Sequence, residues 1–205
     1  MAPRRKVFLY GASGHAKVIL DILHANGIAV KALIDDNPQL SGLAGIEVLH
    51  SAAGLSPIII SIGNNRIRKL IAERLDCEFV RAIHPSANVS GSAKIGTGTV
   101  VMAGTTINAD AHIGRHCIIN TNASIDHECV IDDFVHISPN VALCGNVHLG
   151  EGTHIGVGAS VIPGIKIGKW CTIGAGATVL NDIPDGSTAV GIPAKIVRIN
   201  SKIQQ

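Results

Sequence analysis

Residues 95–130 read IGTGTV VMAGTT INADAH IGRHCI INTNAS IDHECV when they are divided into sixes from Ile95. The first residue of every six is aliphatic. The series runs without insertion or deletion through Val89, Ile95, Val101, Ile107, Ile113, Ile119, Ile125, Ile131, Ile137, Leu143, Leu149, Ile155, Val161, Ile167, Ile173 and Val179. The residue four positions later is usually small, as in Ala123 and Cys129. An amphipathic helix has a period near 3.6 and a strand has a period of two, whereas a fixed period of six is typical of a parallel β-helix.

The repeat resembles the left-handed hexapeptide β-helices, in which three hexads form one triangular coil. Sixteen hexads then give a little over five coils, and residues eighteen apart stack at the same edge of the prism. Stability in such an array comes from stacking, because one coil cannot bury its own apolar face. Gly or Asn is expected at the corners, where the backbone angles are unusual.

Residues 6 to about 80 follow a different pattern. Short apolar strands are expected at 7–10, 30–34, 57–62 and 79–80. Helical spacing is expected from Ala16 to Asn26-Gly27 and over 67–75. This alternation predicts a small parallel α/β sheet with Rossmann-like winding. We therefore predict an α/β N-terminal Rossmann-like domain over residues 1–83 and a left-handed parallel β-helix with a C-terminal tail over 84–205.

Composition narrows the class of protein. The net charge is +2, and there is no basic stripe of the kind that binds nucleic acid. No apolar run is long enough to span a bilayer, and residues 1–6 lead directly into a strand rather than a signal peptide. Cys117, Cys129 and Cys171 occupy the small slot of the repeat, so they are expected to pack in the core in a reducing compartment. A cytoplasmic location follows as an expectation.

The turn Gly11-Ala12-Ser13-Gly14-His15 lies between a predicted strand and a predicted helix. This position directs free backbone N–H groups and the positive end of the helix at an anion. Asp35 ends the next strand, where an acidic residue can hold a ribose or a base. The spacing fits neither a dinucleotide fingerprint nor a Walker loop, and a plain connecting turn is the alternative. Ligands bind at the carboxyl ends of parallel strands, so Asp36 and Gly63 are expected at the same rim.

His127-Glu128 is the pair on the repeat best suited to chemistry. It lies at a turning position where the side chains point outward, and a carboxylate can orient an imidazole as a general base. The alternative is a solvated corner histidine. Gly145 follows His127 by eighteen residues and is expected to stack on it, where its N–H can serve a ligand.

Taken together, several segments resemble one family over nearly the whole chain. They are the Gly11–His15 loop, Asp35-Asp36-Asn37, the stretch from Asn120 to Pro139, and Gly191-Ile192-Pro193-Ala194-Lys195. The chain is similar to the sialic-acid O-acetyltransferase/PglD-type sugar acyltransferases, which are acetyl-CoA-dependent hexapeptide-repeat enzymes.

The resemblance implies a role for each matching residue. His127 corresponds to the general base and Glu128 to the residue that raises its basicity. The acetyl-CoA contacts correspond to His136, Gly145, Val157, Ala175 and Lys195. The substrate contacts correspond to Gly14, His15, Ala16, Lys17, Asp35, Asp36, Gly63 and Asn120. Val157 and Ala175 lie twelve residues out of phase with Gly145. A ligand that touches both edges would therefore lie between neighbouring prisms of a homotrimer.

The implied activity is transfer of acetyl from acetyl-CoA, without metal, to the 4-amino group of a nucleotide-linked 4-amino-4,6-dideoxy sugar, as in bacillosamine or lipopolysaccharide synthesis. UDP is the expected carrier, with dTDP and GDP left open. Transfer is expected to be direct, with Cys144 as a wall residue. The alternatives are O-acetylation of a sialic-acid-type sugar, a scaffold without activity, and a metal protein that uses His127, His136 and His154.

Overall fold

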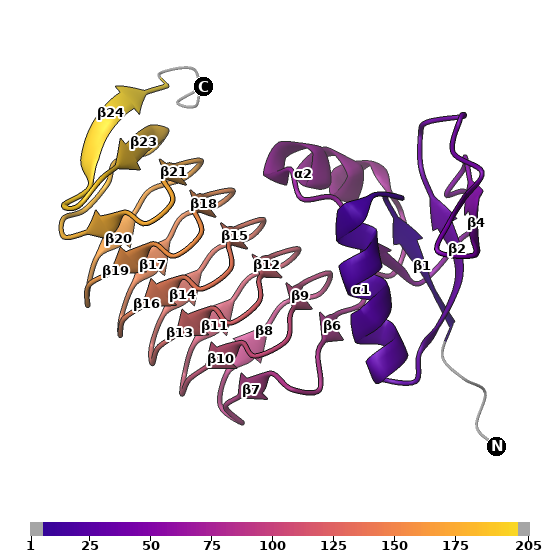
Figure 1. Ribbon diagram of the computed structural model, residues 1–205, viewed down its shortest axis with the longest axis horizontal. Coiled ribbons are helices and arrows are strands. Elements are labelled where there is room, and N and C mark those ends of the chain that lie inside the picture. Colours follow the sequence, from indigo (N-terminus) through magenta and orange to yellow (C-terminus); the bar gives the residue numbers. More distant parts are fainter. Residues whose placement is uncertain (1–5, 201–205) are drawn as a thin grey trace.

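The six-residue repeat forms a three-walled prism in the computed structural model, which describes residues 6–200 (Figure 1). Each hexad contributes one two-residue strand, and each strand pairs in parallel with the strand eighteen residues away, as Ile107 pairs with Ile125. The left-handed parallel β-helix is thus confirmed. Residues 1–5, which include most of the segment expected not to be a signal peptide, and residues 201–205 lie outside the described residues.

We name two walls after their outward side chains, as the small-residue wall and the basic wall. The third is the docked wall, on which the N-terminal domain packs. The small-residue wall contains β7 (Asn88–Val89), β10 (Thr106–Ile107), β13 (Ser124–Ile125), β16 (Ala142–Leu143), β19 (Ser160–Val161) and β22 (Thr178–Val179). The basic wall contains β8 (Lys94–Ile95), β11 (His112–Ile113), β14 (Val130–Ile131), β17 (His148–Leu149) and β20 (Lys166–Ile167). The docked wall contains β6 (Ala82–Ile83), β9 (Val100–Val101), β12 (Ile118–Ile119), β15 (His136–Ile137), β18 (His154–Ile155), β21 (Thr172–Ile173), β23 (Ser187–Val190) and the antiparallel β24 (Lys195–Ile199).

Three edges join these walls. The His127 edge lies between the small-residue and basic walls and carries residues 126–128 and 144–146. The docked edge lies between the basic and docked walls and carries residues 114–116 and 132–134. The Val157 edge lies between the docked and small-residue walls and carries residues 156–158 and 174–176.

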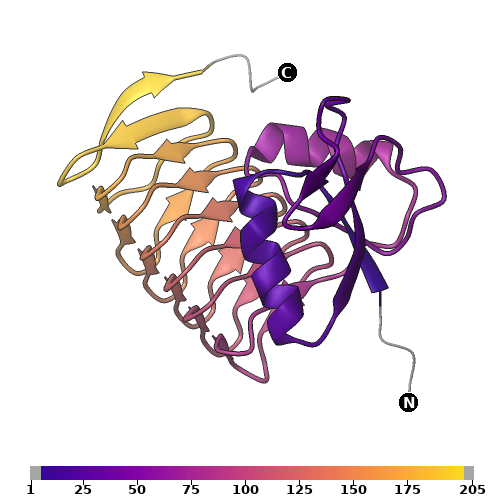
Figure 2. The same ribbon diagram turned by 45° about the vertical axis from the view of Figure 1, so that its right-hand side comes forward.

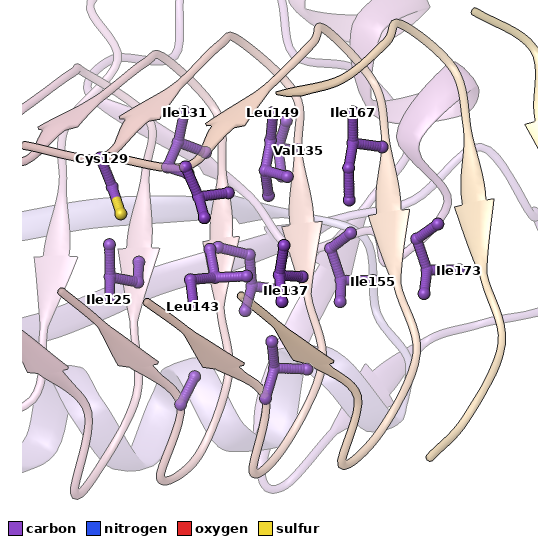
Figure 3. Close-up of a cluster of buried hydrophobic side chains, with 14 of the residues drawn as sticks. Ile125, Cys129, Ile131, Val135, Ile137, Leu143, Leu149, Ile155, Ile167 and Ile173 are labelled. Atoms are coloured by element: carbon purple, nitrogen blue, oxygen red, sulfur yellow. The ribbon is translucent and has the colours of Figure 1, made fainter. Parts of the chain in front are cut away.

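Both series of the repeat face the interior of the prism, as predicted. Ile125, Cys129 and Leu143 are among the side chains that fill it, and each is at most 2% exposed (Figure 3). Cys117, Cys129 and Cys171 are buried free thiols. The narrow interior is thus packed with aliphatic and small side chains.

Every edge turns at a residue with positive φ, and these residues recur every six positions from Gly98 to Gly176. The expected Gly and Asn occur there, but His116, Phe134 and Trp170 occupy the same position on the docked edge, with φ between 53° and 61°. Aromatic residues were not expected in this conformation. The His116 and Phe134 rings stack on this edge, which faces the N-terminal domain, with their centroids 5.3 Å apart.

The N-terminal domain is a five-stranded sheet in the order β3-β4-β2-β1-β5. Its strands are β1 (Lys6–Tyr10), β2 (Ala29–Ile34), β3 (Gly42–Leu43), β4 (Ile46–Leu49) and β5 (Ile58–Ile60), and only β3 is antiparallel to its neighbour. The helices are α1 (Gly14–Ala25) and α2 (Asn65–Arg74). The β3–β4 hairpin was not predicted. The strand expected at 79–80 is only an isolated bridge between Phe79 and Ile58.

The domain packs on the prism through α1 and α2 (Figure 2). Val100, Met102 and Ile118 of the docked wall are buried in one cluster with α1 and β1. Since β6 already pairs with β9, the expected division at 83/84 falls directly after the first strand of the docked wall. The position of that division stays a prediction. Over residues 6–200, neither helix is both long and apolar enough to cross a membrane.

Candidate active site

His127 and Glu128 lie side by side on the His127 edge. Glu128 has the positive φ of the corner, and its Oε2 lies 3.1 Å from Nδ1 of His127. The two side chains are 57% and 65% exposed. If Nδ1 carries the proton that Glu128 accepts, Nε2 holds a free lone pair that faces solvent. The pair therefore has the arrangement of an oriented, accessible base.

Asp126 fixes the backbone beside this pair. Its Oδ1 accepts hydrogen bonds from the His127 N–H and from Asn108 Nδ2, both at 2.8 Å. The hydrogen bond from Asn108, followed by the one from the His127 backbone, lowers the pKa of Asp126. The carboxylate thus stays ionised and continues to hold the edge in place.

Gly145 lies directly against the His127 ring, one coil further along. A Cβ at Gly145 would lie 2.5 Å from Cε1 and 2.6 Å from Nε2 of His127, so only glycine leaves room for the ring in this position. The register is set by the hydrogen bond from Asn146 N to His127 O at 2.9 Å. Within residues 6–200 the Gly145 N–H has no acceptor, so it is available to a ligand. The predicted stacking of Gly145 on His127 is confirmed.

The glycine-rich loop is held at the carboxyl rim of the N-terminal sheet by Asp35. Asp35 Oδ2 accepts from Ala12 N at 2.8 Å and Oδ1 accepts from Asn37 N at 3.0 Å. Ser61 Oγ donates to Gly11 O from the other side at 2.6 Å. Both carboxylate oxygens thus already shape the loop, and ligand binding by Asp35 stays a prediction.

Asp36 faces a different set of residues. It accepts hydrogen bonds from the Tyr10 hydroxyl and from Arg74. Burial, followed by the hydrogen bond to Asp36, raises the pKa of Tyr10 to about 12. The hydrogen bond from Tyr10 lowers the pKa of Asp36. This cluster borders a cavity of about 460 Å³ between α2 and residues 50–54.

Three histidines with low pKa values gather where the rim meets the docked wall. Burial, followed by the positive charge of Arg68, lowers the pKa of His15 to about 4 and also lowers that of His154. Burial, followed by His154, lowers the pKa of His136 to about 3, with further contributions from Arg68 and His15. The His136 and His154 rings stack with centroids 4.8 Å apart. All three rings are therefore neutral at neutral pH.

A cavity of about 530 Å³ opens beside these rings, between the start of α2 and the docked wall. Gly63, His136 and His154 contribute to its lining. Asn120 Nδ2 lies 3.4 Å from Nε2 of His136. The structure thus brings His136 and Asn120 together, and it places Gly63 and His15 close to His136.

The other predicted site residues lie elsewhere. Gly14 and Lys17 are exposed at the start of α1, whereas Ala16 is buried in the core and can offer a ligand only its backbone. Val157 and Ala175 are exposed on the Val157 edge, and Lys195 is exposed at the start of β24. Within one chain the His127 edge lies on a different side of the prism from the N-terminal domain.

Sequence reasoning missed the charged residues of α2 that meet the prism. Arg68 is 1% exposed and hydrogen bonds to backbone carbonyls of the docked edge. Ile67 and Leu70, two of the apolar residues that gave the expected helix over 67–75 its spacing, are 47% and 65% exposed. A buried arginine among apolar helical positions gives no sequence signal of its own. For the metal alternative, residues 6–200 contain no group of three His, Cys, Asp or Glu side chains placed to hold an ion.

Family models match segments in both parts of the chain. Residues 6–75 match the PglD N-terminal domain, and residues 146–181 match the bacterial transferase hexapeptide of six repeats. A curated relative, UDP-N-acetylbacillosamine N-acetyltransferase of Bacillus subtilis (strain 168), is 45% identical over 112 residues, 48% of this chain. The chain spans about half the length of that relative (52%) and 23% of an uncharacterised mimivirus protein that is 34% identical.

Solved structures match over nearly the full length. A histidine-to-asparagine variant of perosamine N-acetyltransferase from Caulobacter crescentus, in complex with CoA and GDP-perosamine, is 42% identical, with a TM-score of 0.91 over 94% of this chain and 97% of that one. The acetyltransferase domain of PglB from Neisseria gonorrhoeae, in complex with acetyl coenzyme A, is 40% identical, with a TM-score of 0.88 over 95% of this chain and 100% of that one.

Proposed function

The chain belongs to the hexapeptide-repeat sugar N-acetyltransferases with a PglD-type N-terminal domain, and from that premise we propose the reaction that it catalyses. It transfers acetyl from acetyl-CoA to the 4-amino group of a nucleotide-linked 4-amino-4,6-dideoxy sugar for glycan synthesis in the cytoplasm. UDP is our expected carrier, although the perosamine relative carries a GDP-sugar. The observation that carries the proposal is the exposed His127–Glu128 pair, stacked on a glycine whose N–H is free.

The chemistry assigns a step to each group on the His127 edge. The amine nitrogen of the sugar attacks the thioester carbon, and Nε2 of His127 accepts the proton that the nitrogen loses. Glu128 holds Nδ1 and stabilises the imidazolium that forms. The Gly145 N–H stabilises the oxyanion of the tetrahedral intermediate. That intermediate collapses with cleavage of the carbon–sulfur bond, and the CoA thiolate leaves and takes up a proton.

The proposed sugar site and the proposed base belong to different chains of a homotrimer. The glycine-rich loop, Gly63 and His136 lie on the docked side of the prism, whereas His127 lies on another edge. The outward residues of the small-residue wall support close approach of a second prism, because they are all short: Asn88, Thr106, Ser124, Ala142, Ser160 and Thr178. In such an assembly acetyl-CoA would lie between two prisms, along Val157 and Ala175 of the Val157 edge and towards Lys195.

The test is a panel of UDP-, dTDP- and GDP-linked 4-amino sugars, each mixed with acetyl-CoA, with release of free thiol followed over time. We expect one carrier to be preferred and the product to be an amide that resists mild alkaline hydrolysis. An alkali-labile ester would instead favour the O-acetyltransferase. His127→Ala should lose about 10²- to 10⁴-fold in kcat, the range for a general base, with the trimer intact by light scattering. Near-normal turnover of that variant would remove His127 from the role.

A further inference from the structure

Arg68 is a cation enclosed between the two domains. It lies on α2, is 1% exposed, and donates to five acceptors. Burial lowers its pKa to about 10, which still leaves the guanidinium charged at neutral pH. No carboxylate within residues 6–200 pairs with it, and four of its five acceptors are backbone carbonyls. Because most of its hydrogen bonds go to backbone carbonyls, the buried guanidinium fixes the backbone around it.

Two of these bonds orient the loop that follows β5. Nη1 donates to the carbonyls of Ile62 at 3.0 Å and Gly63 at 3.2 Å. In a trans peptide the C=O and the N–H point in opposite directions. The N–H groups of Gly63 and Asn64 therefore point away from the buried guanidinium, towards the open side of the loop. Neither N–H has an acceptor within residues 6–200, and both residues line the cavity beside His136.

The other bonds attach the same guanidinium to the prism. Nε donates to His116 O at 2.7 Å and Nη2 donates to Phe134 O at 2.8 Å, on successive coils of the docked edge. Nη2 also donates to Asn65 Oδ1 at 2.8 Å, and Asn65 Nδ2 donates in turn to Gly152 O at 2.9 Å. One side chain thus fixes the Gly63 loop relative to the wall that carries His136.

We propose that Arg68 is a positioning residue for the nucleotide-sugar substrate. It turns the Gly63 and Asn64 N–H groups outward and holds them at a fixed distance from the docked wall, so that they can donate to the anionic or carbonyl oxygens of the nucleotide. The role as a substrate positioner rests on the proposed function. The orientation of the two N–H groups rests on the geometry alone.

The experiment compares two variants of Arg68 with one matched control. Arg68→Lys keeps the charge but lacks the planar guanidinium with its several N–H donors, and Arg68→Met removes both the charge and the donors. Lys69→Gln removes the neighbouring link from α2 to Glu151 of the prism without touching the Gly63 loop. Binding of UDP, dTDP and GDP is measured by calorimetry, and KM is measured separately for the nucleotide amino sugar and for acetyl-CoA.

Both Arg68 variants should weaken nucleotide binding and raise KM for the sugar about tenfold or more, because two ligand hydrogen bonds are misaligned. KM for acetyl-CoA should stay within about twofold, as should both constants in Lys69→Gln. A purely structural role would lower the melting temperature and change both KM values together, or change neither. Wild-type nucleotide affinity in folded Arg68→Lys overturns the inference, and so does a wild-type protein that binds none of the three nucleotides.

Two further results keep this inference separate from the proposed function. A wild-type protein that binds UDP, dTDP or GDP but acetylates no sugar of the panel contradicts the proposed function. The nucleotide affinities of the Arg68 variants then still decide the Arg68 inference. If both Arg68 variants fail to fold, amide hydrogen exchange of the wild-type protein decides. Added nucleotide should slow exchange at Gly63 and Asn64, and unchanged exchange there refutes the inference.

Discussion

Gly145→Ala tests whether catalysis depends on the position of the His127 ring. The added Cβ would lie 2.5 Å from Cε1 and 2.6 Å from Nε2 of His127. Carbon atoms in contact stay about 3.5 Å apart, so the ring must move by about 1 Å. A displacement of that size at a reacting group costs about 10²-fold in rate. We expect kcat to fall about 100-fold in the thiol-release assay, with the unfolding free energy changed by less than about 0.5 kcal/mol.

Gly91→Ala is the matched control. Gly91 lies on the same edge, fifty-four residues and therefore three coils before Gly145, and a Cβ there would meet nothing within 4 Å. Neither glycine has a positive φ, so alanine is compatible with the backbone at both positions. Gly91→Ala should keep wild-type kcat. A Gly145→Ala enzyme within about threefold of wild type would refute the reasoning from ring position.

The double variant His127→Ala/Gly145→Ala separates two causes of the loss. If alanine acts by displacing His127, it should cost nothing further once the ring is absent. If it acts by moving the Gly145 N–H away from the oxyanion, the two losses should multiply, since independent effects add in free energy. A double variant as active as His127→Ala alone therefore assigns the effect to the ring.

Two further predictions concern the assembly and the buried histidines. Mixed trimers of His127→Ala and His15→Ala subunits should recover measurable turnover, because some interfaces combine an intact base with an intact sugar loop. If no turnover is recovered after subunit exchange has been verified, the site is not shared between chains. His116→Phe should reduce acid sensitivity. Burial, followed by Arg68, lowers the pKa of His116 to about 4, so the unfolded chain binds more protons than the folded one as pH falls below about 6.5. The wild type should thus lose about 2 kcal/mol of unfolding free energy from this residue between about pH 7 and pH 5, measured by chemical denaturation. An equal loss in His116→Phe would exclude His116 as its source.

The prism could be predicted because its sequence rule is local and strict. Each inward position needs an aliphatic or small side chain, and the eighteen-residue coil then fixes which residues stack, as it does for His127 and Gly145. The N-terminal domain follows weaker rules. The β3–β4 hairpin turns at Ala44-Gly45, both with positive φ, but its two strands are too short to show a period. The local sequence pattern therefore predicted the elements that belong to a long, regular series, and it missed the isolated short strands of the hairpin.

The surface that joins the two domains could not be predicted by the same means. Periodicity treats α2 as a helix with one apolar face, and on that basis Leu70 should be buried and Arg68 exposed. The structure has the reverse, because α2 lies against a prism edge that offers backbone carbonyls of His116 and Phe134, and a guanidinium satisfies those acceptors where a leucine cannot. The aromatic residues at the positive-φ corners have the same origin: Phe134 and Trp170 lie within 6 Å of the α2 cations Lys69 and Arg66. The repeat fixes the phase of every prism residue, but only the docked domain determines which edge becomes an interface. That distinction explains why the residues on the His127 edge could be found from the sequence, whereas Arg68 required the structure.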